Sequence, residues 1–333
     1  MVQQLASGMV LDSNKRSETM SMQSGKLLIV GSVAYDEVAV PGYETRTDLL
    51  GGAATAASIA ASPLHQGTRL LGVVGADFKQ EHTDLLKQHA IDLAGLSRIE
   101  GGDTFRWGAR YETDLNHRTT LYTHLNVFDD WSPVLPEGWE QTPFVFLANI
   151  HPKLQHHVLD SMRGTPFVAM DTMNLWIATE RPSLERLLKR VNAVIISDQE
   201  ALMLTNTRPI LQMGRAVQSL GPKTVVIKRG EYGAMLFHHD EYFYIPAHPL
   251  EFVIDPTGAG DSFAGGFMGM LARHQDVSMD TMRRAMVAGS VMASFCVQGF
   301  GVHGMAHKTL DHLQERYRMA LELTRCPEFN PLM

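Results

Sequence analysis

The stretch DPTGAGDSFAGGFMGML, residues 255–271, decides the fold. Its proline ends an extended segment, and the Gly-Ala-Gly at residues 258–260 favours a tight turn. After the turn, apolar residues recur at helical spacing as far as Leu271, which predicts an α-helix that begins near Asp261. A glycine turn that leads into a helix presents backbone N–H groups at the positive end of the helix dipole. The stretch therefore predicts an anion site with a carboxylate in the first helical turn.

Two well-known phosphate-binding motifs are absent from this stretch, and a plainer interpretation exists. There is no GxxxxGK[ST] pattern, and Phe263 stands where the third glycine of GxGxxG would be. Asp261 alone is also compatible with a helix-capping carboxylate beside an ordinary turn. The rest of the chain decides between an anion site and a cap.

Short apolar runs alternate with helix-compatible stretches along most of the chain. The runs predict buried strands at 26–33, 68–75, 143–150, 166–171, 193–197 and 223–230. The remaining stretches predict helices at 53–62, 78–90, 154–162, 183–191, 210–220, 259–271, 279–297 and 308–324. This alternation predicts an α/β fold of three layers, in which helices cover both faces of a mostly parallel sheet.

Two segments depart from the alternation. Residues 37–50 and 104–126 alternate polar and apolar side chains and carry β-branched and aromatic residues, and no crossover helix follows them. We expect them to form a small antiparallel sheet at the edge of the α/β body.

The composition argues against several classes of protein. The 333 residues carry a formal charge of −7, which disfavours nucleic acid or an anionic membrane as partner. The two cysteines, Cys296 and Cys326, fit neither a zinc site nor a disulfide framework, so we expect a cytoplasmic protein. Residues 1–25 lack the apolar core of a signal peptide, and we expect them to be a disordered extension outside the fold.

The residues around the turn resemble those of a known family. DPTGAGDSFAGG, residues 255–266, resembles the C-terminal signature of the phosphofructokinase B (PfkB) or ribokinase-like carbohydrate kinases. Gly51 and Gly52, before an alanine-rich helix, resemble the N-terminal signature of that family. The resemblance covers residues 26 to about 323 and implies a Rossmann-like ribokinase fold, as one domain over 26–325. The two departing segments would then be its β lid over the acceptor.

The resemblance implies roles for the residues of the turn. Asp261 would be the catalytic base, and Gly258, Ala259 and Gly260 would form an anion hole for the γ-phosphate. Because the transition state of phosphoryl transfer is loose, the carboxylate mainly orients the hydroxyl and takes its proton late. Asp255 would lie near the acceptor or near a loop that binds a monovalent cation.

The acceptor and the nucleotide are placed by the same resemblance. Asp36 matches an aspartate that binds vicinal hydroxyls, with a solvated strand-end carboxylate as the alternative. Gly51 and Gly52 would let the backbone approach the acceptor, or would act as a hinge between lid and helix. Lys228 and Gly230 match contacts to the nucleotide, and a solvent-facing strand end is the alternative for the lysine.

Further nucleotide contacts are implied from Thr257, together with the two glycines of the turn, Gly258 and Gly260. Residues 288–301 would wall the adenine pocket or simply pack into the core.

The metal site departs from the family pattern. Glu200 matches the glutamate of the NxxE motif and would organise Mg²⁺ through water. Ser197 stands where the motif has asparagine, so Asp198 either contributes to the metal shell or caps the following helix, and we favour the cap.

The acceptor site departs from the pattern as well. The asparagine usual after the Gly-Gly signature is missing from residues 55–57, so one hydroxyl contact of ribokinases is absent. Residues 171–176, DTMNLW, resemble an Asp/Asn-Arg-Trp stretch without its arginine. Polar lid residues that either meet a charged acceptor or keep the sheet edge from pairing are Arg106, Arg110, Asp114, Asn116 and Arg118.

Together, the motifs predict a Mg²⁺-dependent kinase that transfers the γ-phosphate of ATP to a hydroxyl of a sugar or sugar-like molecule. A monovalent cation such as K⁺ is a further implied cofactor. The nearest alternative acceptor is a nucleoside whose base stacks on Phe105, Trp107 or Tyr111. A non-catalytic sugar or nucleotide sensor is the alternative from another class. We expect a homodimer through the lid, with neither nucleic acid nor membrane as partner.

Overall fold

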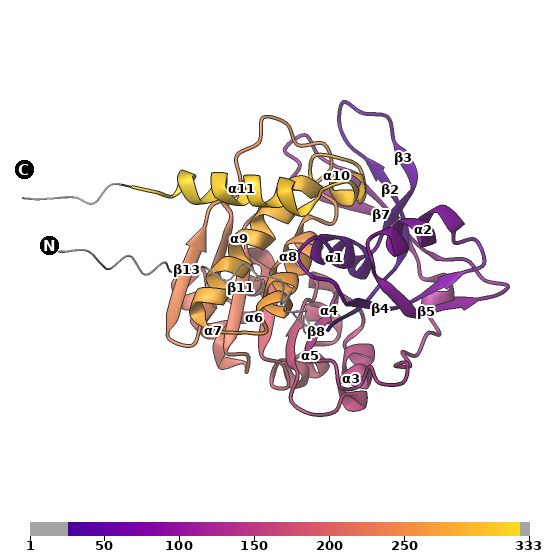
Figure 1. Ribbon diagram of the computed structural model, residues 1–333, viewed down its shortest axis with the longest axis horizontal. Coiled ribbons are helices and arrows are strands. Elements are labelled where there is room, and N and C mark those ends of the chain that lie inside the picture. Colours follow the sequence, from indigo (N-terminus) through magenta and orange to yellow (C-terminus); the bar gives the residue numbers. More distant parts are fainter. Residues whose placement is uncertain (1–25, 327–333) are drawn as a thin grey trace, which may run out of the picture.

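The computed structural model describes residues 26–326 and places a large sheet between two layers of helices (Figure 1). The predicted extension at residues 1–25 lies outside the described residues. The sheet has nine strands, in the order β13 (Glu241–Ile245), β12 (Ala234–His238), β11 (Thr224–Lys228), β10 (Ala193–Ser197), β9 (Phe167–Met170), β8 (Phe144–Leu147), β1 (Leu27–Val30), β4 (Thr68–Gly75) and β5 (Asp92–Ile99). Its neighbouring strands are parallel except in the pairs β11–β12 and β12–β13, so the predicted mostly parallel sheet is confirmed.

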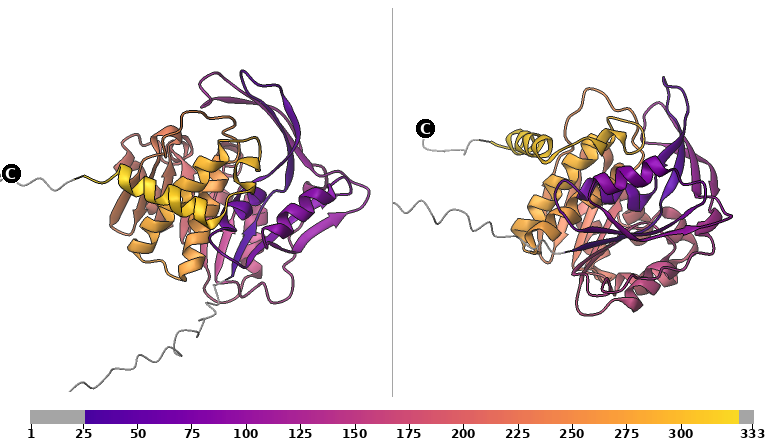
Figure 2. Two further views of the ribbon diagram at one scale, coloured as in Figure 1. Left: turned by 45° about the horizontal axis from the view of Figure 1, so that its top comes forward. Right: turned by 45° about the vertical axis from the view of Figure 1, so that its right-hand side comes forward.

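Helices cover both faces of this sheet (Figure 2). One face packs against α1 (Ala53–Ala61), α2 (Gln80–Gln88), α8 (Ala259–His274) and α9 (Met279–Cys296), and α10 (His303–Ala306) and α11 (Leu310–Leu323) pack on the outside of α9. The other face packs against α3 (Pro152–Ser161), α4 (Asn174–Thr179), α5 (Arg181–Leu188), α6 (Asp198–Thr205) and α7 (Ile210–Ser219). Successive side chains of a strand enter opposite cores, which is why the strands appear in the sequence as continuous apolar runs.

The lid is a second sheet of four strands, in the order β3 (Arg46–Gly51), β2 (Ala34–Ala39), β6 (Phe105–Tyr111) and β7 (Arg118–His124). The expectation of an antiparallel lid is wrong at its centre, because β2 and β6 are parallel. The physical reason is that β2 follows β1 in the chain and β6 follows β5. Because β1 and β5 run in the same direction in the large sheet, the chain leaves both at the same end of the sheet.

Three strands of the large sheet were not predicted from the sequence. β5 and β13 are edge strands with several exposed side chains, and β12 is a short apolar run in a hairpin with β13. Two short 3₁₀ turns, η1 (Asn126–Phe128) and η2 (Gly230–Tyr232), complete the described structure. None of the helices in the described part of the chain is long and apolar enough to span a membrane.

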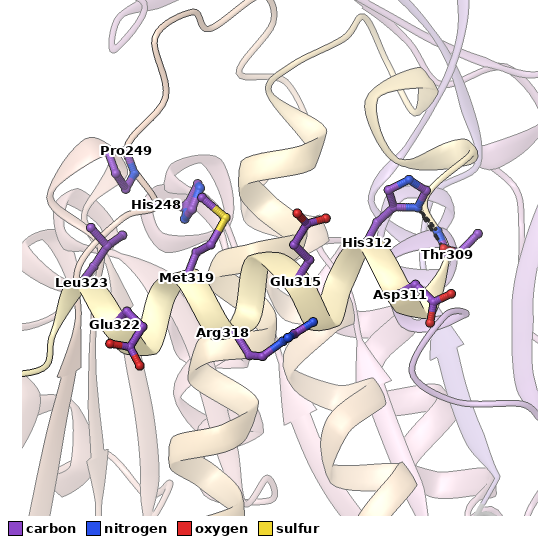
Figure 3. A pocket seen from close by; sticks show the side chains of 10 residues that line it. All are labelled: His248, Pro249, Thr309, Asp311, His312, Glu315, Arg318, Met319, Glu322 and Leu323. Carbon is purple, nitrogen blue, oxygen red and sulfur yellow. Dashed lines mark hydrogen bonds between the residues drawn. The ribbon is translucent and has the colours of Figure 1, made fainter.

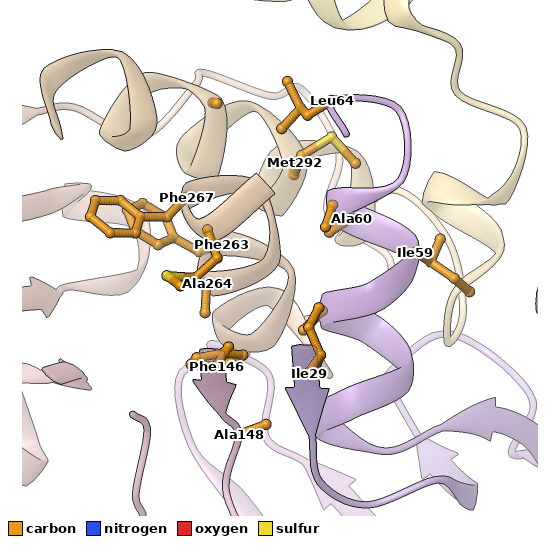
Figure 4. Packing of buried hydrophobic residues seen from close by; sticks show 14 of the residues in the cluster. Ile29, Ile59, Ala60, Leu64, Phe146, Ala148, Phe263, Ala264, Phe267 and Met292 are labelled. Carbon is orange, nitrogen blue, oxygen red and sulfur yellow. The ribbon is translucent and has the colours of Figure 1, made fainter. Parts of the chain in front are cut away.

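Glycines and alanines bring α1 and α8 into backbone contact (Figure 4). A β-carbon added at Gly265 would lie 2.1 Å from the carbonyl oxygen of Ala57, and one added at Gly269 would lie 3.0 Å from Cα of Ala61. The two glycines are four residues apart and therefore occupy one face of α8. Larger residues on this face would push the helices apart.

This contact sets the position of both helix N-termini. Gly52 precedes α1 with φ 93°, and Gly258 precedes α8 with φ 75°, conformations that disfavour residues with a side chain. A β-carbon at Gly258 would lie 3.5 Å from Cβ of Ala56 in α1. The Gly-Gly signature and the Gly-Ala-Gly turn therefore meet at the same end of the sheet.

We expect Gly265→Ala to lower the free energy of unfolding by about 3 kcal/mol, because the methyl group has no space against a backbone carbonyl. Gly269→Ala is the matched control on the same face. Its smaller overlap is offset by the better helix propensity of alanine, so we expect a change within about 1 kcal/mol. Urea unfolding of the two variants measures both values, and equal losses would show that the α1–α8 distance is not limiting.

Candidate active site

The predicted base lies in the first turn of α8. Gly258 is the N-cap and Asp261 the third helical residue. The first hydrogen bond within the helix runs from the N–H of Ser262 to the carbonyl oxygen of Gly258, at 2.8 Å, so the three preceding N–H groups have no partner within the helix. The N–H of Ala259 donates to the carbonyl oxygen of Pro256. The donors at Gly260 and Asp261 remain at the positive end of the helix.

Asp261 combines burial with nearby charges of both signs. Burial raises the pKa of its carboxyl group, the cations of Lys228 and Arg118 oppose this, and the carboxylate of Glu200 adds to it. A raised pKa makes the carboxylate a better proton acceptor at neutral pH.

Asp36 faces the same point from the lid strand β2. Its side chain is buried, and a β-carbon at Gly51 would lie 2.0 Å from its Oδ2, so only glycine leaves room for the carboxylate. Burial and the negative charges of Asp255 and Asp261 raise the pKa of Asp36 to about 7, although a hydrogen bond from the Gly52 backbone lowers it. The alternative of a solvated strand-end carboxylate is therefore wrong.

Asp255 connects two loops behind the turn. Its Oδ1 accepts from the N–H of Thr257 at 2.9 Å, and its Oδ2 accepts from the N–H of Gly301 at 3.1 Å. The side chain is fully buried, and burial raises its pKa. Each carboxylate oxygen thus already accepts one backbone N–H, and these bonds hold the start of the turn to the loop after α9.

Lys228 reaches the turn from the end of β11. Its Nζ lies 3.1 Å from Oδ2 of Asp171, and the side chains are 16% and 6% exposed. A β-carbon at Gly260 would lie 2.9 Å from the same Nζ. The alternative of a solvent-facing strand end is therefore wrong for Lys228, whose ammonium group lies against the predicted anion hole.

Asp171 was not predicted as a site residue. It directly follows β9, two strands from β11 in the sheet, so the carboxyl ends of two parallel strands bring it to Lys228. The signal was present in the sequence as a charged residue at the end of each of two buried strands.

Glu200 has a structural partner. Its Oε2 accepts from the N–H of Ser197 at 2.7 Å, and Oγ of Ser197 accepts from the N–H of Glu200, which together form a capping box for α6. The N-cap of α6 is thus Ser197, and the favoured assignment of Asp198 as the cap is wrong. Asp198 is the first helical residue and lies 3.9 Å from Nε of Arg229.

The residues at the site fit Mg²⁺ held largely by water and phosphate. Within residues 26–326 there is no group of three or more His, Cys, Asp or Glu side chains that could hold a metal ion by themselves. Mg²⁺ commonly binds nucleotide phosphates with one or two carboxylates and several waters, and Glu200 is close enough to act on the charges of Lys228 and Asp261.

The lid meets the body at two places. The hydroxyl groups of Tyr111 and Thr257 lie 3.0 Å apart, which joins β6 to the start of the turn. At the tip of the β6–β7 hairpin, Oδ1 of Asn116 would lie 3.6 Å from a β-carbon at Gly230. The lid therefore contacts the body at the start of the turn and lies near it at the loop after β11.

The lid side chains divide into two groups. Arg106 is held by Asp48 at 2.6 Å and Asp77 at 3.1 Å. Phe105 stacks on Phe128, with ring centroids 5.7 Å apart. These two residues are thus part of the lid framework.

A second group lies beside the reacting residues. Trp107 is the register partner of Asp36, and Cζ of Arg118 lies 5.3 Å from the centroid of its ring. Arg118 also stabilises the charged forms of Asp36 and Asp261. Trp107 and Arg118 are thus lid side chains that lie near Asp36 and Asp261 and are suited to contact an acceptor.

A groove of the described surface lies elsewhere. It has a volume of 990 Å³ and runs along α11, between residues such as His248, Glu315 and Met319 (Figure 3). It contains none of the residues described above, so we do not assign the active site to it.

Comparison with known proteins agrees with this geometry. Residues 26–308 match the family described as pfkB family carbohydrate kinase. The chain is 28% identical to the cytidine kinase of Thermococcus kodakarensis, over 74% of this chain and 88% of that protein.

Solved structures show the same fold. The nucleoside kinase of Methanocaldococcus jannaschii, an archaeal member of the ribokinase family, superposes with a TM-score of 0.73 at 22% identity and covers 89% of this chain and 98% of its own. An Escherichia coli protein assigned as a ribokinase, solved with ATP and Mg²⁺, has a TM-score of 0.74 at 17% identity and covers 89% and 99%. The chain therefore belongs to the PfkB family of carbohydrate kinases and is a phosphotransferase that acts on a hydroxyl group of a sugar or sugar-like acceptor.

Proposed function

We propose that this kinase binds Mg-ATP across the carboxyl end of the sheet and phosphorylates a hydroxyl group held by Asp36. The observation that carries the proposal is the meeting of Asp261, the N-terminus of α8 and the Lys228 ammonium at one point. A carboxylate, backbone donors and a cation are the groups that phosphoryl transfer requires around its reacting atoms. A non-catalytic sugar or nucleotide sensor would need groups that bind the ligand but no catalytic base, so Asp261 in this position favours a kinase.

In the proposed reaction, the acceptor oxygen attacks the γ-phosphorus and the bond to the β,γ-bridging oxygen breaks, so ADP leaves. Asp261 orients the hydroxyl group and takes its proton late. The N–H groups of Gly258 and Gly260 and the Lys228 ammonium stabilise the negative charge on the γ-phosphate oxygens, whereas the N–H of Ala259 donates to the carbonyl oxygen of Pro256. Closure of the lid over the acceptor would exclude water and so protect ATP from hydrolysis.

Gly230, Thr257 and residues 288–301 belong to the same proposal as nucleotide contacts. Support comes from the lid hairpin near Gly230 and from the bond between Thr257 and Tyr111, since both residues lie where the lid meets the body. Glu200 would bind water molecules that coordinate Mg²⁺. When bound, this ion would neutralise negative charge on the phosphates. K⁺ near Asp255 stays a prediction. Both carboxylate oxygens of Asp255 already accept backbone N–H groups, and these contacts do not point to a cation.

The acceptor is proposed to carry a vicinal diol, bound by Asp36 with close approach to the backbone at Gly51 and Gly52. A sugar and the ribose of a nucleoside both offer this group. Trp107, the register partner of Asp36 in the lid, supports the nucleoside as a second candidate, because its ring offers a surface on which a base can stack. Homodimerisation through the lid and a cytoplasmic location stay predictions, the latter supported by two free cysteines, Cys296 and Cys326.

Asp261→Asn should lower kcat by about 10³-fold, because the proton acceptor is lost while the helix N-terminus is kept. The measurement is ADP release from Mg-ATP with pentoses, hexoses, sugar acids, inositols and nucleosides. Asp280→Asn is the matched control, since Asp280 is also in a first helical turn but is exposed. Unchanged turnover of Asp261→Asn would refute the base assignment.

The KM for the acceptor should rise as the pH falls through 7. The pKa of Asp36 is raised to about 7 by burial and by Asp255 and Asp261, against Arg118 and the Gly52 N–H. Only the ionised carboxylate accepts from two hydroxyl groups, and its ionised fraction falls about tenfold between pH 8 and pH 6. Asp36→Asn should give a high KM with no such slope, and a flat wild-type profile would contradict the assignment.

Tyr111→Phe removes the bond between the lid and Thr257, so we expect kcat/KM to fall about fivefold, equivalent to one hydrogen bond of about 1 kcal/mol. Tyr122→Phe is the matched control, because the hydroxyl group of Tyr122 bonds to Glu37 within the lid. Steady-state kinetics of the two variants compare a contact across the cleft with one inside the lid, and equal effects would argue against a role in closure.

A further inference from the structure

We propose that Asp171 is a positioning residue, which holds the Lys228 ammonium against the anion turn and keeps it from pairing with the base Asp261. This inference rests on the proposed function of Lys228 and Asp261. It assigns a role to a buried carboxylate that is not expected to touch either substrate.

The first observation is the buried ion pair between Asp171 and Lys228. The two side chains come from different strand ends and meet at 3.1 Å with little exposure to solvent. A buried charge pair is costly to desolvate and contributes little to stability compared with apolar packing. A role in holding an ammonium group in one place explains why a pair would be kept there.

The second observation is the competition for this ammonium group. The carboxylates of Asp171, Glu200 and Asp261 all act on the charge of Lys228 and together raise its pKa, against the effect of burial. Oε2 of Glu200 is already engaged by the N–H of Ser197. Without Asp171, the ammonium would be left with Glu200, which acts on its charge more strongly but is fixed in the capping box of α6, and with Asp261, which directly follows Gly260 on the turn beside Nζ.

A direct pair between Lys228 and Asp261 would harm the reaction in two ways. It would lower the basicity of the carboxylate that has to accept the proton. It would also take the ammonium away from the phosphate oxygens, whose charge it is proposed to stabilise. Asp171 therefore acts by giving Lys228 a carboxylate partner other than the base.

The third observation is that Asp171 is itself held rigidly. Its Oδ1 accepts from the N–H of Thr172 at 2.7 Å, and its carbonyl oxygen accepts from Nε2 of Gln155 at 3.1 Å. The same Nε2 donates to the carbonyl oxygens of Leu147 and Ala148, at the end of the neighbouring strand β8. One fully buried glutamine thus ties the ends of two strands together directly behind the ion pair.

The experiment is a double-mutant cycle with Asp171→Asn and Lys228→Met, singly and together. The asparagine keeps an oxygen for the Thr172 N–H but removes the charge. Kinetics with Mg-ATP and the acceptor found in the panel give kcat, the KM for ATP and the pH profile. Asp160→Asn is the control, since Asp160 pairs with Arg190 in an exposed position on α3.

We expect Asp171→Asn to lower kcat about 30-fold and to change the KM for ATP by less than about threefold, whereas Asp160→Asn changes neither. The acid limb of the kcat profile should move to lower pH, because Lys228 then pairs with Asp261. In the Lys228→Met background, Asp171→Asn should have no further effect on kcat, since its partner is gone. A merely structural role would give the same loss in both backgrounds and would overturn the inference.

A readout independent of turnover is the titration of Asp261, followed by ¹³C NMR of protein labelled at aspartate carboxyl carbons and assigned with Asp261→Asn. The groups that face this carboxyl are Lys228, Arg118, Glu200, Asp36, Asp171 and Cys296. Asp171→Asn should lower the pKa of Asp261 when Lys228 is present and leave it nearly unchanged in Lys228→Met. An equal shift in both backgrounds would mean a through-space effect of charge and would overturn the inference.

These two arms separate the inference from the proposed function. If no acceptor is turned over, the kinase proposal fails, and the titration alone decides about Asp171. If the wild type is active but Asp171→Asn equals it in kcat, the inference fails and the kinase proposal stands. If Asp171→Asn does not unfold cooperatively, Asp171→Ser replaces it, because its hydroxyl group also accepts from the Thr172 N–H and leaves space for water.

Discussion

The backbone contact between α1 and α8 is the constraint on which the active site depends. It exists because Gly265 and Gly269 face alanines rather than larger side chains. At the site end of these helices, the same closeness brings the N-cap glycine of α8 beside α1, so that the proposed acceptor and phosphate sites adjoin. The site is thus a result of helix packing, and its precision comes from the core beneath it.

The second organising feature is an excess of buried carboxylates around a single lysine. Asp36, Asp171 and Asp261 all have raised pKa values, with burial as the main cause. Each carboxylate makes the next one harder to ionise, whereas Lys228 and the lid residue Arg118 compensate. Such an excess of carboxylates would repel a bare polyphosphate, which is consistent with the proposal that ATP binds together with Mg²⁺.

The sequence predicted most of the parts of this site and fewer of the connections between them. The three layers, the anion turn, Asp36 and Lys228 followed from local patterns and the family signatures. The parallel centre of the lid, the Asp171–Lys228 pair and the Tyr111–Thr257 bond did not, because each joins segments that are far apart in the chain. The cap of α6 was misassigned by one residue, because serine and aspartate are both good caps and adjacent here.

The placement of Asp36 on β2 has a consequence for the order of events in turnover. The carboxylate proposed to hold the acceptor belongs to the lid sheet, whereas Asp261 belongs to the helix beneath. If the acceptor binds to Asp36 as proposed, a movement of the lid would move the acceptor and its carboxylate together, relative to Asp261. Loading of the acceptor and alignment for attack would then be a single movement, and the reverse movement would carry the phosphorylated product away from the anion turn.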